Sequence, residues 1–223
     1  MNKKLERLIA QSDIVSFDIF DTLIYRKCGN YKGVFALVAQ KMEEPEEFVT
    51  DRIRAERIAR KKKKTEITIE DIYAEMKGKE ASWNRTCIAT EKATELEMCV
   101  QNPEMKDIFD YCHKNRKQII IITDMYLDKK TIVEILTICG YRDYDKIYIS
   151  SVCGEKKSDG KIFKRILSEL NIPANTMLHI GDNWKSDYFM PKIKGIKTYW
   201  YKDGMKSELP RGRSSDIMGK REL

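Results

Sequence analysis

Four places along the chain carry polar side chains that could do chemistry together. They are Asp18, Thr123, Lys157 and the pair Asp182 and Asp187. Carboxylate oxygens suit Mg²⁺, which is usually held by one or two carboxylates together with phosphate oxygens. The three aspartates therefore predict a Mg²⁺ site, while Thr123 and Lys157 would hold an anion beside it. Singly, each residue also suits an ordinary role in a turn, a helix cap or the surface, so the prediction rests on their joint occurrence.

Predicted strands would bring these places together. Apolar runs rich in β-branched residues predict strands at 14–17, 118–124, 146–151, 177–182 and 196–201, and the intervals predict helices at 3–12, 103–114, 129–139, 161–170 and 187–194. Strands that alternate with helices form a parallel sheet with right-handed crossovers. The carboxyl ends of such strands meet at one edge, where ligands bind. We therefore predict an α/β fold with the polar residues at that edge.

The stretch from Tyr31 to about Pro103 has a different character. It shows helical periodicity and dense charge, and it predicts three or four helices, the last at 84–100. In one of them Phe48, Ile53 and Ile58 mark the apolar positions. This block is predicted to be an insertion into the α/β pattern.

A basic cluster lies within this insertion. It comprises Arg54, Glu56, Arg57 and Arg60, followed by four lysines at 61–64. A charge run on a helix usually forms a solvated face. The other interpretation is that the cluster meets an anionic substrate.

Composition narrows the function classes. The 223 residues include 42% hydrophobic and 35% charged residues, with a formal net charge of +7. This size and apolar content suit one α/β core with a modest second lobe. The positive charge fits a small anionic substrate as well as a nucleic acid, but the sequence lacks zinc-finger spacing, a Gly/Arg tract and an RNP-like motif. We therefore expect no nucleic-acid partner.

The apolar runs and the cysteines of the sequence indicate the cellular compartment of the protein. The N-terminal residues lack a leader-like apolar core, and no apolar run in the sequence is long enough to span a membrane. The six cysteines show no C-x-x-C spacing and fall mostly in apolar segments. We expect a cytoplasmic protein with reduced thiols and no membrane partner.

The motifs resemble those of the haloacid dehalogenase (HAD) superfamily. Asp18, in Phe-Asp-Ile-Phe-Asp-Thr-Leu, matches the nucleophile of motif I, and Thr123 matches the hydroxyl of motif II. Lys157 matches the lysine of motif III. Asp182 and Asp187, in Gly-Asp-Asn-Trp-Lys-Ser-Asp, match the acidic motif IV. The resemblance implies that Asp18, Thr123 and Lys157 are catalytic and that Mg²⁺ is the cofactor.

The resemblance also implies a domain organisation. Residues 1–25 and 104–205 would form a Rossmann-like core, and residues 26–103 a helical cap of the kind inserted between motifs I and II. Residues 206–223 have no apolar period and are expected to form a flexible tail.

One position departs from the family pattern. Phosphatases of the family usually carry an aspartate two residues after the nucleophile, where it protonates the leaving group, but this chain has Phe20 there. A phenyl ring cannot transfer a proton. The main-chain carbonyl of Phe20 would still be able to bind the metal, alongside Asp18 and Asp182. Asp21 is a candidate substitute for the missing acid.

The resulting interpretation is a Mg²⁺-dependent hydrolase. It would act on a small phosphate ester or acyl phosphate, such as a sugar phosphate, through an aspartyl-phosphate at Asp18. Two alternatives remain: a dehalogenase-like or other non-phosphoryl hydrolase, and a catalytically impaired phosphate-binding module. The acidic residues Asp182 and Asp187 argue against the first because a dehalogenase needs no cation. Phe20 is the feature that favours the second.

Overall fold

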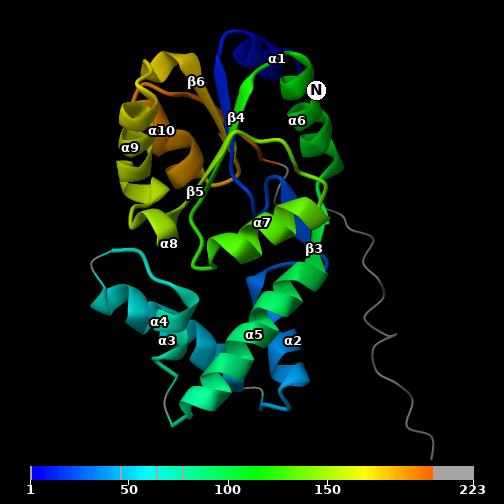
Figure 1. Cartoon of the computed structure of the whole chain (residues 1–223), viewed down its shortest axis with the longest axis vertical. Helices are drawn as coiled ribbons and strands as arrows, with labels where there is room; N and C mark the ends of the chain where they lie inside the picture. The colour runs from blue at the N-terminus through cyan, green and yellow to red at the C-terminus, as the bar shows by residue number, and fades with distance from the viewer. Residues whose placement is uncertain (1, 46, 64, 77, 203–223) are drawn as a thin grey trace, which may run out of the picture.

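The computed structural model describes residues 2–45, 47–63, 65–76 and 78–202, and its central feature is a parallel sheet in the order β5-β4-β1-β6-β7 (Figure 1). The strands are β1 (Ile14–Phe17), β4 (Gln118–Thr123), β5 (Lys146–Ile149), β6 (Met177–Gly181) and β7 (Lys197–Trp200). Neighbouring strands all pair in parallel, which confirms the predicted α/β fold. The predicted flexible tail at 206–223 lies outside the described residues.

Strand β1 lies at the centre of the sheet. From it the chain moves outward through β4 to β5, then returns to the other side of β1 to form β6 and β7. Ligands of open parallel sheets bind outside the carboxyl ends of the strands, at the point where the direction of winding reverses. Asp18 directly follows β1 and is therefore placed at this point.

Helices cover both faces of the sheet. Val15, Phe17 and Ile119 belong to a buried cluster on one face, whereas Ile14 and Ile120 belong to a cluster on the other. The first face packs against α1 (Lys3–Ala10), α6 (Pro103–Lys114) and α7 (Lys129–Ile138), and the second against α9 (Lys161–Leu170). Burial on both faces explains why the strands read as continuous apolar runs.

Short elements complete this part of the chain. They are α8 (Ser150–Cys153), the 3₁₀ turns η1 (Lys157–Asp159) and η2 (Ala174–Thr176), the π-helix η3 (Trp184–Phe189) and α10 (Met190–Ile193). Two of them differ from prediction. The strand predicted at 146–151 ends at Ile149, and Ser150 begins α8. The π-helix η3 takes the place of the first residues of the helix predicted at 187–194. Within the described ranges, no helix is both long and apolar enough to cross a membrane.

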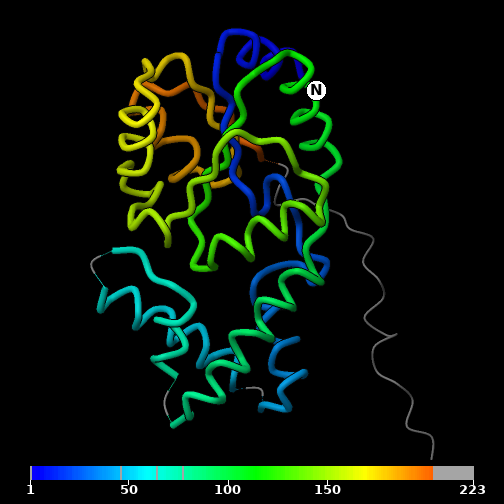
Figure 2. Tube along the Cα trace, viewed as in Figure 1, coloured from blue at the N-terminus to red at the C-terminus, as the bar shows by residue number. Residues whose placement is uncertain are grey.

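Four helices lie together beyond one end of the sheet (Figure 1). They are α2 (Tyr31–Lys41), α3 (Glu47–Lys62), α4 (Ile69–Tyr73) and α5 (Ala81–Met98), and we call residues 31–98 the helical insert. The chain enters through β2 (Ile24–Arg26) and leaves through β3 (Cys99–Gln101), which pair antiparallel (Figure 2). The helix predicted at 84–100 therefore ends earlier, and its last residues form β3.

A buried ion pair holds the insert together. Arg52 on α3 and Glu91 on α5 are fully buried and form a bidentate pair, with N···O distances of 2.9 and 2.8 Å. The hydroxyls of Tyr73 and Tyr126 also donate to Glu91, at 2.7 and 2.9 Å. The helix therefore buries an arginine, while Ile53, predicted to be an apolar core position, is only partly buried.

We predict that Arg52→Met lowers the free energy of unfolding by about 3–5 kcal/mol, because the buried carboxylate of Glu91 loses its partner. Arg52→Met combined with Glu91→Gln should recover most of this loss, since glutamine is neutral and still accepts from the tyrosine hydroxyls. Urea unfolding of the single and double variants measures both effects. Equal losses in the two variants would contradict the explanation.

Candidate active site

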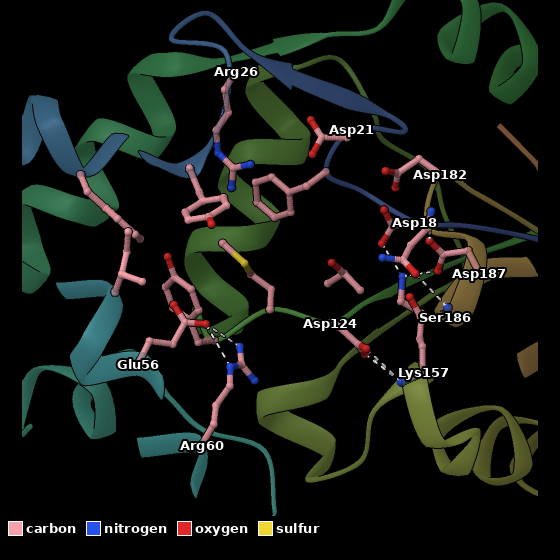
Figure 3. Close-up of a pocket in the computed structure, with 18 of the residues that line it drawn as sticks. Asp18, Asp21, Arg26, Glu56, Arg60, Asp124, Lys157, Asp182, Ser186 and Asp187 are labelled. Atoms are coloured by element: carbon pink, nitrogen blue, oxygen red, sulfur yellow. Dashed lines mark hydrogen bonds and ion pairs between the residues drawn. The ribbon is translucent and has the colours of Figure 1, made fainter. Parts of the chain in front are cut away.

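The carboxyl edge of the sheet and the helical insert enclose a cavity of about 530 Å³ (Figure 3). From the sheet side it is lined by all five residues singled out for chemistry: Asp18, Thr123, Lys157, Asp182 and Asp187. Asp18 and Asp182 directly follow β1 and β6, and Thr123 is the last residue of β4. Lys157 begins the turn η1, and Asp187 lies in η3. The structure thus brings together residues that are far apart in the sequence.

Three carboxylates and one ammonium form the centre of this site. One oxygen each of Asp18, Asp182 and Asp187 lies within 4.8 Å of the others. Lys157 Nζ lies 2.5 Å from Asp18 Oδ1 and 2.6 Å from Asp187 Oδ1. With all four groups ionised, the cluster carries more negative than positive charge. All-oxygen donors with excess negative charge fit Mg²⁺.

The ionisation of these groups reflects burial and mutual repulsion. Burial raises the pKa of Asp18 well above its usual value, against the lowering effect of Lys157. The pKa of Asp182 rises to about 6, through burial and then the charge of Asp187. Burial also acts to raise the pKa of Asp187, but Lys157 and His179 hold it below its usual value. Burial would lower the pKa of Lys157, but Asp18 and Asp187 outweigh it and raise that pKa.

Asp187 is fixed by a chain of buried hydrogen bonds. Its Oδ2 accepts from the Asn183 main-chain N–H at 3.0 Å, and its Oδ1 lies 3.2 Å from His179 Nε2. Burial lowers the pKa of His179 and so favours the neutral ring. We infer that Nε2 carries the proton toward Asp187, while Nδ1 accepts from the Ser16 hydroxyl at 2.7 Å. His179 is therefore buried, as its place in a strand predicts, but it also orients a site carboxylate.

Two local features of the backbone place Asp187. It lies in the π-helix η3, a rare form that is frequent at functional sites. Gly181 ends β6, and a Cβ atom there would lie 2.5 Å from the Asp187 side chain. A glycine is therefore required for the carboxylate to reach its position.

The loop after β4 also supports the site. Thr123 is buried and lines the cavity. The next residue, Asp124, accepts from the Lys157 main-chain N–H at 2.9 and 3.1 Å and so fixes the turn that carries this lysine. This role of Asp124 was not among the predictions, and adjacency to Thr123 was the only signal for it.

Phe20 and Asp21 both line the cavity. Asp21 has a φ of +60°, a left-handed conformation that is strained for most residues but tolerated by aspartate. Its N–H donates to the Ile24 carbonyl at 2.9 Å, which closes the turn into β2. Burial raises the pKa of Asp21, and Arg26 opposes this rise. Because Asp21 lines the cavity and its pKa is raised, its carboxyl is a candidate for proton transfer to a substrate bound there.

The insert contributes charge to the opposite wall. Glu56, Arg57 and Arg60 of α3 line the cavity, and Arg60 is paired with Glu56 at 2.8 Å. Arg54 pairs instead with Asp51, and Arg54 is exposed. Arg54 thus fits the solvated-face interpretation, whereas Glu56, Arg57 and Arg60 are also placed where they could meet a substrate, although Arg57 and Arg60 are exposed.

Comparison with known proteins identifies the family. A model of the haloacid dehalogenase-like hydrolases matches residues 13–192. Among curated relatives, a glyceraldehyde 3-phosphate phosphatase of Pyrococcus abyssi is 39% identical over 61 residues, which cover 27% of this chain and 26% of the relative. The haloacid dehalogenase-like hydrolase domain-containing protein 3 of Danio rerio is 32% identical over 78 residues, 34% of this chain and 32% of the relative. The matches thus span about a quarter to a third of these relatives.

Solved structures agree on the fold. A haloacid dehalogenase-like family hydrolase from Xanthomonas campestris has a TM-score of 0.63 at 18% identity, covering 85% of this chain and 81% of that one. The HAD-hydrolase YfnB from Bacillus subtilis, bound to magnesium, has a TM-score of 0.61 at 17% identity, covering 85% and 88%. The family model covers most of the chain, including the motifs from Asp18 to Asp187. The chain belongs to the haloacid dehalogenase-like hydrolase family.

Proposed function

We propose that this hydrolase is a Mg²⁺-dependent phosphatase acting on small phosphate esters or acyl phosphates, with Asp18 as the nucleophile. The observation that carries the proposal is the placement of the Asp18 carboxylate, 2.5 Å from Lys157, in an acidic cluster that lines the cavity. The match to glyceraldehyde 3-phosphate phosphatase, although partial, supports a small phosphorylated substrate such as a sugar phosphate.

The residues divide the chemistry among them. An Asp18 oxygen bonds to phosphorus while the bond from phosphorus to the leaving oxygen breaks, and water later hydrolyses the resulting aspartyl phosphate. Lys157 and Thr123 hold the phosphoryl oxygens. Asp18, Asp182 and the Phe20 carbonyl would hold Mg²⁺, with Asp187 bound through water or orienting the other ligands. A bound Mg²⁺ supplies positive charge that reduces the repulsion between the carboxylate and the phosphoryl group.

The helical insert acts as a cap in this proposal, with domain boundaries near residues 26 and 103. Besides lining the cavity, it contacts the loops around the site. Glu66 accepts from the buried Ser150 hydroxyl at 2.9 Å, and the Ile69 N–H donates to the Tyr126 carbonyl at 3.0 Å. Closure of such a cap excludes water and selects the substrate.

The test is a screen of sugar phosphates, acyl phosphates and aryl phosphates, each with and without Mg²⁺. We expect turnover that requires Mg²⁺ and is fastest with acyl and aryl phosphates, because Phe20 provides no acid. The second candidate, a non-catalytic phosphate-binding module, is favoured by Phe20 alone. Phosphate binding without turnover of any substrate would support that module and contradict the phosphatase.

Mg²⁺ binding should weaken as the pH falls through the pKa of Asp182. Below a pKa of about 6, a proton competes with the metal for this carboxylate, whereas above that value Asp182 is ionised and available to the metal. We expect affinity to fall roughly tenfold per pH unit below that value. The measurement is the difference in Tm with and without Mg²⁺ at each pH between 5 and 8. Groups that do not bind the metal change both Tm values equally, so their titration cancels in this difference.

Variants of the two aspartates show which carboxylate binds Mg²⁺ directly in this experiment. Asp182→Ala should weaken Mg²⁺ binding more than Asp187→Ala, because a direct ligand contributes more than a residue that orients it. Asp143→Asn, which changes an exposed aspartate, is the matched control and should leave the rise in Tm unchanged. An unchanged affinity for Mg²⁺ in Asp182→Ala would contradict the assignment.

A further inference from the structure

One part of the cavity wall combines an aromatic ring with a cation. Arg26 of β2 places its guanidinium carbon 4.2 Å from the centroid of the Phe20 ring. Both side chains line the cavity that contains Asp18, and Figure 3 shows Arg26 among the residues around this cavity. A positive charge therefore lies over the residue that replaces the usual acid of the family.

The guanidinium is held in one orientation. Arg26 Nε and Nη2 donate to the two carboxylate oxygens of Glu95 on α5, at 2.8 and 2.9 Å. Arg26 is 6% exposed and Glu95 is fully buried. In the part of the chain that the structure describes, no hydrogen-bond acceptor is paired with the remaining nitrogen, Nη1. Arg26 thus keeps both N–H groups of Nη1, and the second N–H of Nη2, for a ligand in the cavity.

Phosphoryl transfer creates a need for such a donor. As the bond from phosphorus to the leaving oxygen breaks, its electron pair moves onto that oxygen, which becomes negative. An acid would neutralise it with a proton, but Phe20 has none to give. A guanidinium stays charged and does not give up its proton, yet it can donate a hydrogen bond to an oxyanion. In a cavity from which water is excluded, such a bond is stronger than in water.

We propose that Arg26 is a catalytic residue whose Nη1 donates a hydrogen bond to the leaving oxygen. The positive charge of the guanidinium would then stabilise the negative charge on that oxygen, which an acid at position 20 would otherwise protonate. The inference rests on the proposed phosphatase function and narrows its substrate class. A leaving group that departs as a stable oxyanion, such as the carboxylate of an acyl phosphate, needs no proton. The products of an acyl phosphate and water are then a carboxylate, phosphate and a proton released to solvent.

The main alternative is that Arg26 and Glu95 only stabilise the structure. A structural role predicts an equal loss of activity with every substrate. Contact with the leaving oxygen predicts instead that the loss grows as the leaving group becomes more basic, because more charge develops on that oxygen. The dependence of kcat/KM on leaving-group pKa therefore separates the two roles.

The experiment compares acetyl phosphate and a series of substituted phenyl phosphates in the presence of Mg²⁺. The first variant is Arg26→Lys, which keeps the charge beside Glu95 but lacks the forked group needed to reach both partners. We expect losses in kcat/KM of up to about 10²–10³-fold for the most basic phenol, as for removal of an oxyanion donor, and much smaller losses for acetyl phosphate.

Two further variants keep the test decisive. The double variant Arg26→Met with Glu95→Gln leaves no buried unpaired charge, so it is useful even if the lysine variant folds poorly. Its loss in kcat/KM should also grow with the pKa of the leaving group. Asp143→Asn, which changes an exposed aspartate outside the cavity, is the matched control and should keep the wild-type dependence of kcat/KM on leaving-group pKa. A uniform loss across the series, with wild-type turnover intact, would overturn the role of Arg26 only. A wild type with no turnover of any phosphate would overturn the proposed function as well.

Discussion

Asp18→Asn should lower kcat/KM for all phosphate substrates by about 10⁴-fold or more, because it removes the proposed nucleophile, on which both chemical steps would depend. The protein should remain folded. Burial raises the pKa of Asp18, which means that the folded structure disfavours its charged form, and Lys157 keeps its second partner, Asp187, at 2.6 Å. Steady-state kinetics and thermal unfolding of the same preparation measure both expectations.

A covalent intermediate gives an independent test of the same residue. Rapid acid quenching of wild type with acetyl phosphate labelled at phosphorus should trap label on the peptide that contains Asp18, because the acetate leaves and the phosphoryl group stays on the enzyme. Asp18→Asn should trap none, whereas Asp143→Asn should trap as much as wild type. Turnover in Asp18→Asn at the wild-type rate would show that another group attacks phosphorus.

Phe20→Asp should raise turnover of alkyl phosphates, because it restores an acid at the position where the family has one. General acid–base help is typically worth about 10²–10⁴-fold. We expect the low end of this range, since Arg26, now 4.2 Å from the ring centroid, would pair with the new carboxylate and lower its pKa. The ratio of kcat/KM for an alkyl and an aryl phosphate is the measurement, and an unchanged ratio would contradict the prediction.

Asp21 provides the control for this experiment. If it already serves as the acid, Asp21→Asn alone eliminates alkyl-ester turnover, and Phe20→Asp adds little. Asp21→Gly removes the same carboxylate while relieving the left-handed backbone. Asp143 has the same φ of +60° but is exposed and lies outside the cavity, so Asp143→Gly shows the backbone effect by itself.

Much of the α/β part of the fold was predictable from the sequence, because its strands are buried on both faces. The continuous apolar run of β4 identifies a parallel strand without knowledge of its neighbours. Helices α6 and α9 begin and end where the sequence predicts, at 103–114 and 161–170. In α6, Asn102 caps the first turn and Pro103 takes its first position, which are local signals.

The elements that were not predictable depend on contacts between distant residues. Strand β3 has only three residues and forms because it pairs with β2, which lies far earlier in the chain. The early end of β5 has a similar cause, since Ser150 turns inward and its hydroxyl accepts from the Met125 N–H at 3.1 Å. Periodicity within a short window carries no information about such partners.

In the candidate site, too, some residues were predictable from the sequence and others depend on contacts between distant residues. The residue types and order of Asp18, Thr123 and Lys157 were enough to predict from the sequence alone that they lie together, and all three line the same cavity. Arg26 and Glu95 carry no motif, and their pairing requires a contact between β2 and α5. Their proposed role follows only from the three-dimensional arrangement, because an arginine in a short strand has no distinctive sequence signal.

The antiparallel pairing of β2 with β3 has an evolutionary consequence. The Lys27 N–H donates to the Met98 carbonyl at 2.8 Å, so the segment that leads into the helical insert is hydrogen-bonded to the last residue of the insert. A segment whose ends meet in this way can be lengthened, shortened or exchanged while the strands on either side keep their places. One sheet with a fixed set of reactive residues can thereby acquire new substrates through replacement of a single module. The recognition of substrates and the chemistry performed on them are therefore free to diverge at different rates.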